Sequence, residues 1–237
     1  MNVLNGFFGS SLGKKYIMAL SGLAMFGFVV AHMVGNLQVF LGPEAINRYG
    51  HFLQNMKELV WPARIFLLAM IALHIWAAIK LTAENRAARP KDYSAAYKKV
   101  GASYASRTMI VSGLVLLTFI IYHLLHFTVQ VDGINFTKTS FKTLEDPQHR
   151  HDIYNMIVIA FQQPIVSIFY IISMSLLSLH LSHGISSMFQ SLGLKNRKYG
   201  TLIDRFALIM AGILIVGYSA IPLAVLTGIL KKVNYGA

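Results

Sequence analysis

Residues 16–41 read YIMALSGLAMFGFVVAHMVGNLQVFL, an apolar run without a single Asp, Glu, Lys or Arg. At about 1.5 Å of rise per residue, a helix of this length crosses the ~30 Å hydrocarbon core of a bilayer. Four further segments are similarly apolar, and they cover residues 61–82, 107–130, 159–184 and 203–230. Continuously apolar runs indicate helices rather than alternating strands. The sequence therefore predicts an all-α bundle of five transmembrane helices.

The composition of the whole chain agrees with this class, because the mean hydropathy is +0.56 and only 13% of the 237 residues are charged. The loops are too short to form a second core, so we expect residues 1–237 to form a single transmembrane domain. The first segment is too long for the apolar part of a cleavable signal peptide and contains a histidine, so we expect it to be retained. The chain has no cysteine, which excludes disulfides, thiolate-bound clusters and cysteine nucleophiles.

The net charge of +12 indicates basic loops and anionic lipid headgroups rather than nucleic acid. With the N-terminus inside, 13 Lys and Arg residues fall on the inner side and 8 on the outer side. This excess predicts a cytoplasmic N-terminus. We expect a helix start at Trp61–Pro62, and a polar outer loop over residues 131–158 with a helix start near Pro147.

Four of the nine histidines lie inside the apolar segments, one in each of the first four. Ionisable side chains inside a bilayer are costly, so four of them indicate a shared purpose. Counted from the nearest basic residue, His32 and His123 lie ~25 Å and ~24 Å from the inner edge, whereas His74 lies ~9 Å from it. His180 is four residues before Gly184, where the apolar run weakens, and it also lies near the inner side.

The depths therefore pair His32 with His123 near the outer face and His74 with His180 near the inner face. Neutral imidazoles that point into a helical bundle are typical ligands of haem iron. We expect two bis-histidine haems ~15 Å apart along the membrane normal. They are expected to be of the b type, because the chain has no C-x-x-C-H attachment motif.

An internal echo relates the helices of the outer pair. Residues 21–32 read SGLAMFGFVVAH and residues 112–123 read SGLVLLTFIIYH. The spacing of 11 residues is about three helical turns, so each Ser-Gly pair shares a face with its histidine. We expect Gly22 and Gly113 to let a flat macrocycle approach the backbone. Ser21 and Ser112 are expected to bond a haem propionate or a backbone carbonyl.

Other roles for histidine remain open at this point. A single intramembrane histidine is often a hydrogen-bonding residue between helices. A proton or ion pathway is the main rival, but such pathways usually use membrane-embedded carboxylates, and the acidic residues here fall in loops or at helix ends. His126 and His183 follow the expected ligands by three residues and are expected to contact propionates or headgroups, with ligand substitution left open. We expect His51 to be solvated, and residues 148–152, QHRHD, are a weak signal for a surface metal.

Several short stretches carry a resemblance to a known family, namely HMVGN at 32–36, LHIWAA at 73–78, S-G-x9-H at 112–123 and SLHLSHG at 178–184. Together with a histidine-free fifth helix, they resemble the five-helix, dihaem cytochrome b subunit of succinate:quinone oxidoreductases and quinol:fumarate reductases. The resemblance covers nearly the whole chain. It implies that the first and third helices hold the haem distal to the soluble subunits, and the second and fourth the proximal one.

The resemblance also implies partners. A flavoprotein with covalent FAD carries out the succinate or fumarate chemistry, so the chain itself is not the catalyst for that reaction. An iron–sulfur subunit docks on the cytoplasmic face, where loops 83–106 and 185–202 are available. Electrons would pass between the clusters, the His74/His180 haem, the His32/His123 haem and a quinone. Some relatives carry a proton-conducting glutamate two residues before the fourth ligand, and Ser178 stands there, which puts such a route in doubt.

We expect the quinone site at the outer end of the bundle, near Glu58, Arg64, His126 and Asn36. A site beside the inner haem is the alternative, and Glu58 and Arg64 are also typical interfacial anchors. Menaquinone is the usual partner of dihaem anchors, although no residue distinguishes it from ubiquinone. Two other classes of function remain: the quinone-reactive cytochrome b of another respiratory complex, such as a hydrogenase or formate dehydrogenase, and a non-redox transporter.

Overall fold

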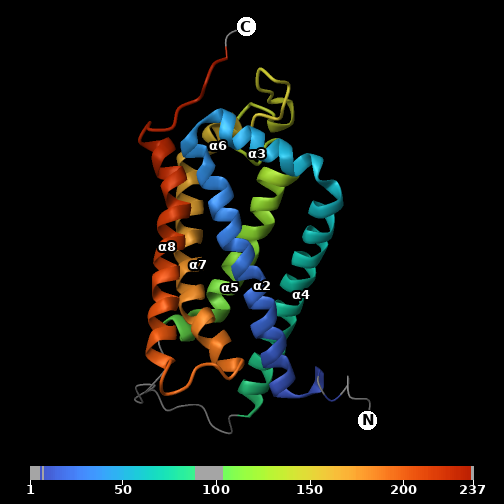
Figure 1. Ribbon diagram of the computed structural model, residues 1–237, viewed down its shortest axis with the longest axis vertical. Helices are drawn as coiled ribbons and strands as arrows, with labels where there is room; N and C mark the ends of the chain where they lie inside the picture. The colour runs from blue at the N-terminus through green and yellow to red at the C-terminus, as the bar shows by residue number, and fades with distance from the viewer. Residues whose placement is uncertain (1–5, 7, 89–103, 236–237) are drawn as a thin grey trace.

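The computed structural model describes residues 6, 8–88 and 104–235. Its five long helices run side by side along the long axis of the molecule (Figure 1), and they are α2 (Ser11–Leu37), α4 (Lys57–Ala87), α5 (Tyr104–His123), α7 (Pro164–Ser191) and α8 (Gly200–Leu226). Each has the length and composition to cross a membrane. The described residues form no strand beyond an isolated bridge between Glu145 and His151. The prediction of an all-α bundle with five apolar helices is confirmed.

The ends of the helices differ from the predicted bounds by three residues or more. α2 begins at Ser11 because the Ser10 hydroxyl accepts a hydrogen bond from the Gly13 amide at 3.0 Å, which is an N-cap. α4 begins at Lys57, one turn before Trp61–Pro62, so the predicted start there is wrong. Pro62 is the sixth residue of α4, and since proline has no amide hydrogen it removes the helical hydrogen bond to the Glu58 carbonyl. The third span ends in a π-helical turn, Leu124–Thr128.

The end of the bundle opposite the N-terminal end of α2 is more ordered than the sequence predicted. The connection between the first two long helices contains the helix α3 (Pro43–Asn55), and the last residues of the expected loop 131–158 belong to the helix α6 (Ile153–Phe161). The helix start expected near Pro147 is wrong, because the Asp152 carboxylate caps α6 by accepting from the Asn155 amide at 3.1 Å. The predicted start of the fourth span at 159 is also wrong, since the apolar run is broken and α7 begins at Pro164.

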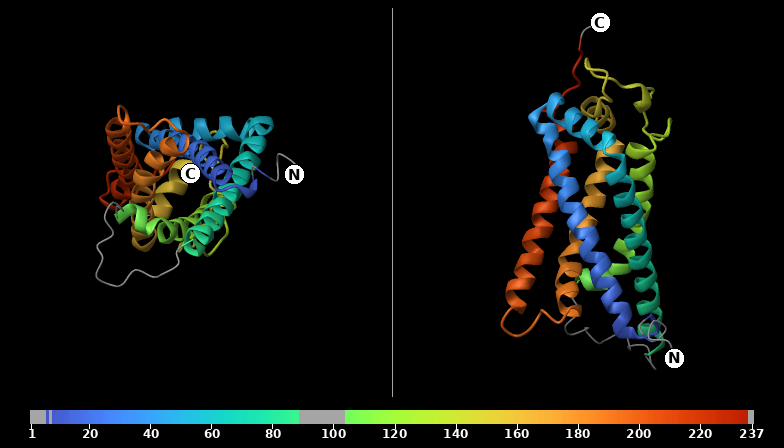
Figure 2. Two further views of the ribbon diagram at one scale, coloured as in Figure 1. Left: turned by 90° about the horizontal axis from the view of Figure 1, so that it is seen from below. Right: turned by 45° about the vertical axis from the view of Figure 1, so that its right-hand side comes forward.

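Both short helices lie at one end of the bundle, together with the C-terminal segment, and the N-terminal end of α2 lies at the other end (Figure 1). α7 packs closely against α8 and α5, while α4 packs mainly against α2 and stands at one side (Figure 2). Only 6% of the residues in the apolar central stretch of α4 are buried, against 39% in that of α8. α4 therefore presents most of its apolar surface to lipid or to a bound group rather than to other helices.

Two glycines allow close packing beneath α3. A Cβ on Gly35 of α2 would lie 2.8 Å from the Tyr49 hydroxyl, and one on Gly50 of α3 would overlap the Ile153 Cδ1 atom of α6. Tyr49 and Ile153 both pack against a buried cluster that includes Val39. These contacts hold α3 across the end of the bundle.

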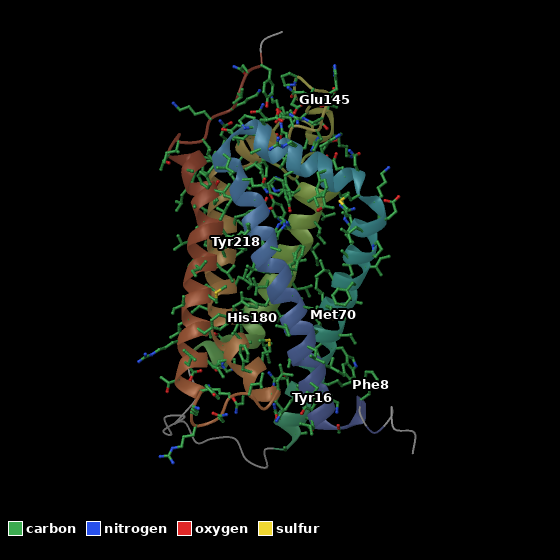
Figure 3. The ribbon with its side chains drawn as sticks, in the orientation of Figure 1. Phe8, Tyr16, Met70, Glu145, His180 and Tyr218 are labelled. Carbon is green, nitrogen blue, oxygen red and sulfur yellow. The ribbon has the colours of Figure 1, made fainter. Side chains whose placement is uncertain are left out.

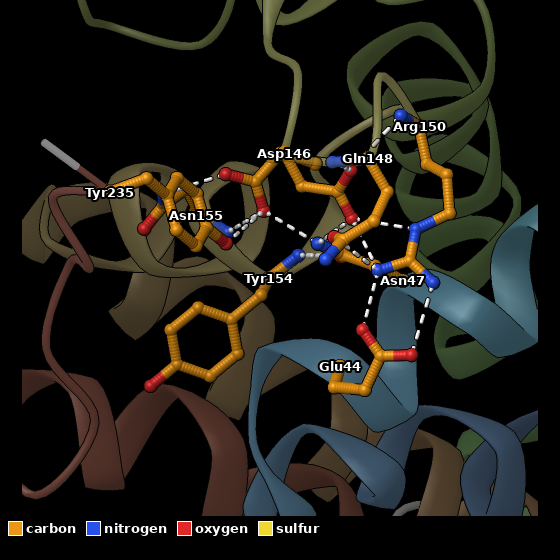
Figure 4. Close-up of polar contacts among 9 residues, drawn as sticks. Glu44, Asn47, Asp146, Gln148, Arg150, Tyr154, Asn155 and Tyr235 are labelled. Atoms are coloured by element: carbon orange, nitrogen blue, oxygen red, sulfur yellow. Dashed lines mark hydrogen bonds and ion pairs between the residues drawn. The ribbon is translucent and has the colours of Figure 1, made fainter. Parts of the chain in front are cut away.

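A buried polar network ties the C-terminal segment to this end (Figure 4). The Asn47 amide of α3 donates to Asp152 at 3.1 Å, and its carbonyl accepts from the Tyr154 amide at 2.9 Å. Asn155 donates to Asp152 at 2.6 Å and exchanges two hydrogen bonds with the Val233 backbone, each 2.9 Å long. The network satisfies a carboxylate that is 1% exposed, as a buried charge requires.

Arg150 extends this network to the surface. Its guanidinium lies 2.6 Å from a carboxylate oxygen of Glu44 and donates through Nε to Asp146 at 2.7 Å. The hydrogen bonds from Arg150 hold the pKa of Glu44 below its ordinary value. Burial alone would raise the pKa of Asp146, but the bonds from Arg150 lower it. Burial raises the pKa of Tyr235, whose hydroxyl donates to Asp152, to about 12.

Candidate functional site: two histidine pairs in the bundle

The four histidines singled out in the sequence meet in two pairs between the long helices. The ring centroids of His32 (α2) and His123 (α5) lie 5.8 Å apart, and those of His74 (α4) and His180 (α7) lie 6.4 Å apart. Figure 3 shows His180 in the half of the bundle that holds the N-terminal end, below Tyr218, which lies 6.4 Å from His32 between ring centroids. The pairs therefore occupy two levels along the bundle.

These spacings fit axial ligation of one iron by each pair. A metal–imidazole nitrogen bond is about 2 Å long, so two imidazoles on opposite sides of one iron hold their centroids roughly 6 Å apart. The interplanar angles are 82° for the outer pair and 55° for the inner pair. Both angles are compatible with ligation, because each ring can turn about its own metal–nitrogen axis. The residues present thus fit a bis-histidine haem at each level.

The two serines of the echo lie against the inner pair. The Ser21 hydroxyl is 3.2 Å from His74 Nδ1, and the Ser112 hydroxyl is 3.1 Å from His180 Nδ1. Each serine also donates to a carbonyl of its own helix, Ser21 to Ile17 at 2.6 Å and Ser112 to Met109 at 3.1 Å. A hydroxyl has one proton, so a serine that donates to its own helix can only accept from an imidazole Nδ1–H. In that tautomer Nε2 is left free to bind a metal.

The backbone bonds expected for the serines are therefore present, but their imidazole partners belong to the other pair. The cause is the spacing of 11 residues, which is ~16 Å along a helix and matches the separation of the two levels. α2 and α5 each provide a histidine at the outer level and a serine at the inner level. Gly22 and Gly113 follow the same rule, since a Cβ would lie 3.5 Å from His74 Cε1 or 3.7 Å from His180 Cε1.

The outer pair has a different set of neighbours. The Tyr170 hydroxyl of α7 lies 3.3 Å from His123 Nδ1 and 3.1 Å from His126 Nδ1. His126 is 1% exposed, so the headgroup contact expected for it is wrong. His32 stacks on Phe28 with centroids 5.3 Å apart. Asn36 donates to the His32 carbonyl at 2.7 Å and lies within 3.4 Å of both ring nitrogens.

The four residues proposed for a quinone separate into two groups. Asn36 and His126 lie beside the outer histidines, as described above. Glu58 and Arg64 are exposed on α4, and the Arg64 guanidinium lies 5.3 Å from the centroid of the Trp61 ring. This cation–π contact favours the interpretation of Glu58 and Arg64 as anchors at the membrane interface. A quinone site at these residues stays a prediction.

Other sequence hypotheses have simpler outcomes. Ser178, which stands at the position of the glutamate in some relatives, donates to the Ala211 carbonyl at 2.9 Å. His183 Nε2 lies 2.9 Å from the Ser187 hydroxyl. His51 is exposed, in α3, and lies 3.0 Å from the Asn55 amide. Across the described ranges, no group of three or more His, Cys, Asp or Glu residues is placed to hold a metal ion, which gives the QHRHD stretch no support.

Two residues at the site were not found by sequence reasoning. Tyr170 lies ten residues before His180, a spacing similar to that between each serine and its histidine, and this signal was available. Lys14 is 5% exposed, and its ammonium lies 2.6 Å from both a Glu84 carboxylate oxygen and the Gly9 carbonyl. The ion pair joins α2 to α4 at the end of the bundle that holds the N-terminal end of α2. Nothing local in the sequence indicates that Lys14 and Glu84 form an ion pair.

Comparisons of this chain with protein-family models, with curated proteins and with solved structures found no match.

Proposed function

We propose that this chain is the membrane anchor and electron-transfer subunit of a succinate dehydrogenase or fumarate reductase complex. In this role it passes electrons between an iron–sulfur subunit and a membrane quinone. The observation that carries the proposal is that four histidines form two pairs at two levels of one bundle. The ring spacing in each pair suits two imidazoles that share one iron. A b haem at each level would supply one-electron redox chemistry.

The residues of the chain would bind and orient these groups. His74 and His180 would hold the inner haem, and Ser21 and Ser112 would fix the tautomers of these two histidines. His32 and His123 would hold the outer haem, with Tyr170 against His123. Electrons that cross the membrane through the bundle would need a haem at both levels. The two levels lie ~16 Å apart, so two haems divide the thickness of the membrane into shorter electron transfers.

The proposed partners are a flavoprotein with covalent FAD and an iron–sulfur subunit on the cytoplasmic side of a prokaryotic inner membrane. They would dock on the end of the bundle where α4 and α7 end and α5 and α8 begin; residues 89–103 lie outside the described part of the chain. The basic residues expected there would attract an acidic partner surface. The proposed quinone, menaquinone by resemblance, would bind near Asn36 and His126 at the other end.

The quinone-reactive cytochrome b of a hydrogenase or formate dehydrogenase is the alternative, since paired histidines serve such proteins too. The test is purification of the chain with its native partners from membranes. We expect the absorption bands of b haem, and we expect succinate to reduce this haem so that the bands change to those of the ferrous form. A flavoprotein should co-purify. Reduction by hydrogen or formate instead would favour the alternative, and a preparation without haem would support a transporter.

A further inference from the structure

The Tyr170 hydroxyl is shared between two histidines. It lies 3.3 Å from His123 Nδ1 and 3.1 Å from His126 Nδ1, and both Tyr170 and His126 are buried. The other ring nitrogen of His126, Nε2, is buried and has no hydrogen-bond partner among the residues that the structure describes. Buried polar atoms are nearly always paired, so this nitrogen calls for a partner.

The donors and acceptors in this row of hydrogen bonds, from His123 through Tyr170 to His126, can be assigned. If His123 binds a metal through Nε2, its Nδ1 carries the proton and donates to the Tyr170 oxygen. The single phenolic proton of Tyr170 is then available only for His126 Nδ1. A neutral His126 that accepts at Nδ1 must carry its own proton on Nε2. The chain of hydrogen bonds therefore has one direction, and it ends on a buried N–H donor.

The local structure encloses this donor. His126 lies in the π-helical turn Leu124–Thr128, which is closed by the hydrogen bond from the Val129 amide to the Leu124 carbonyl at 2.8 Å. Single π-helical turns occur frequently at functional sites. The ring of His126 is surrounded by aromatic rings, with centroids 4.2 Å away for Phe127, 5.1 Å for Tyr122 and 5.6 Å for Phe141.

We propose that His126 Nε2–H donates to an oxygen acceptor of a cofactor bound at the outer level. The acceptor is either a carboxylate at the edge of the porphyrin or the carbonyl of a quinone. Tyr170 is then a positioning residue that fixes the orientation of His123 and His126 together. This inference rests on the proposed function, since the direction of the chain follows from metal binding by His123.

The role of Tyr170 is tested in the purified, haem-loaded complex with Tyr170→Phe. The matched control is Tyr122→Phe. In the wild type the Tyr122 hydroxyl donates to the Ile134 carbonyl at 3.1 Å, and its ring also contacts His126. In Tyr170→Phe we expect the ratio of reduced to oxidised outer haem at a fixed potential to change at least threefold, with the inner haem unchanged. An equal response of the outer haem in both variants would overturn the positioning role.

The donor is tested with His126→Leu, which removes the N–H, and His126→Gln, which retains one in a similar place. Redox difference infrared spectra are recorded on quinone-depleted samples and again after quinone is restored. A shifted carboxylate band in His126→Leu under both conditions identifies the porphyrin as acceptor. A shifted carbonyl band only after restoration identifies the quinone. In either case His126→Gln should resemble the wild type.

Spectra of His126→Leu that match the wild type in both samples, with both haems retained, would overturn this inference alone. Wild-type protein without haem would instead refute the proposed function, so the two failures are distinguishable.

Discussion

Replacing Ser112 with alanine should loosen the inner haem and leave the outer one intact. Ser112 is 3% exposed, and its hydroxyl lies 3.1 Å from His180 Nδ1, where it can accept a hydrogen bond while it donates to Met109. Without it, a buried N–H loses its acceptor, which costs about 1–3 kcal/mol. The loss of such a supporting bond typically weakens metal binding by about 10- to 100-fold. We therefore expect the affinity for the inner haem to fall within that range.

The assay is transfer of haem from the purified protein to an excess of a haem-binding acceptor, followed at the absorption bands of each haem. The control is Ser173→Ala on α7, where a fully buried hydroxyl donates to the Phe169 carbonyl at 2.8 Å. Ser112→Thr should restore retention, because it keeps the hydroxyl. The reasoning is refuted if Ser112→Ala and Ser173→Ala release the inner haem at the same rate.

Three further outcomes follow from the described contacts. Gly50→Ala should lower the free energy of unfolding by about 1–3 kcal/mol, because its Cβ overlaps Ile153, whereas Gly212→Ala meets no atom within 4 Å and should have little effect in the same thermal melts. The lowered pKa of Asp146 contributes stability that is present above the pKa of the unfolded state, ~3.9, and is lost as the pH falls through the pKa of the folded state. In thermal melts between pH 6 and 3, Asp146→Asn should therefore lose less stability on acidification than the wild type does. Equal losses in the two proteins would contradict the assignment. Asn36→Ala should reduce quinone-linked turnover about tenfold more than Arg64→Ala does, with activity toward an artificial acceptor at the soluble subunits as the reference, and a larger effect of Arg64→Ala would place the quinone on α4.

Much of the fold could be predicted because it depends on local properties of the sequence. An apolar run such as 16–41 specifies a spanning helix without knowledge of its neighbours. The constant rise of a helix converts residue numbers into depth, so the pairs His32/His123 and His74/His180 were predicted from counting alone. The helix α6 was missed because its last residues, 159–161, read as the start of the next span, and only Gln162 and Gln163 separate α6 from α7.

The partners of individual side chains could not be predicted in the same way. The sequence places Ser112 on the face of α5 that also carries His123, but it does not say which helix lies opposite each level. Contact between Ser112 and His180 depends on the packing of α5 against α7. The burial of His126 depends on the π-helical turn and on Phe141 from a distant loop, neither of which has a local signal.

The central claim is that four histidines bind two haems in fixed pairs, and counting the haems in double variants tests it most directly. The wild-type chain should bind two b haems, and each single alanine variant of the four histidines should bind one. The double variant of His32 and His123 should still bind one, because both ligands serve the same haem. The double variant of His32 and His74 should bind none. One haem in the wild type, or no haem in the His32/His123 variant with the fold intact, would contradict the claim.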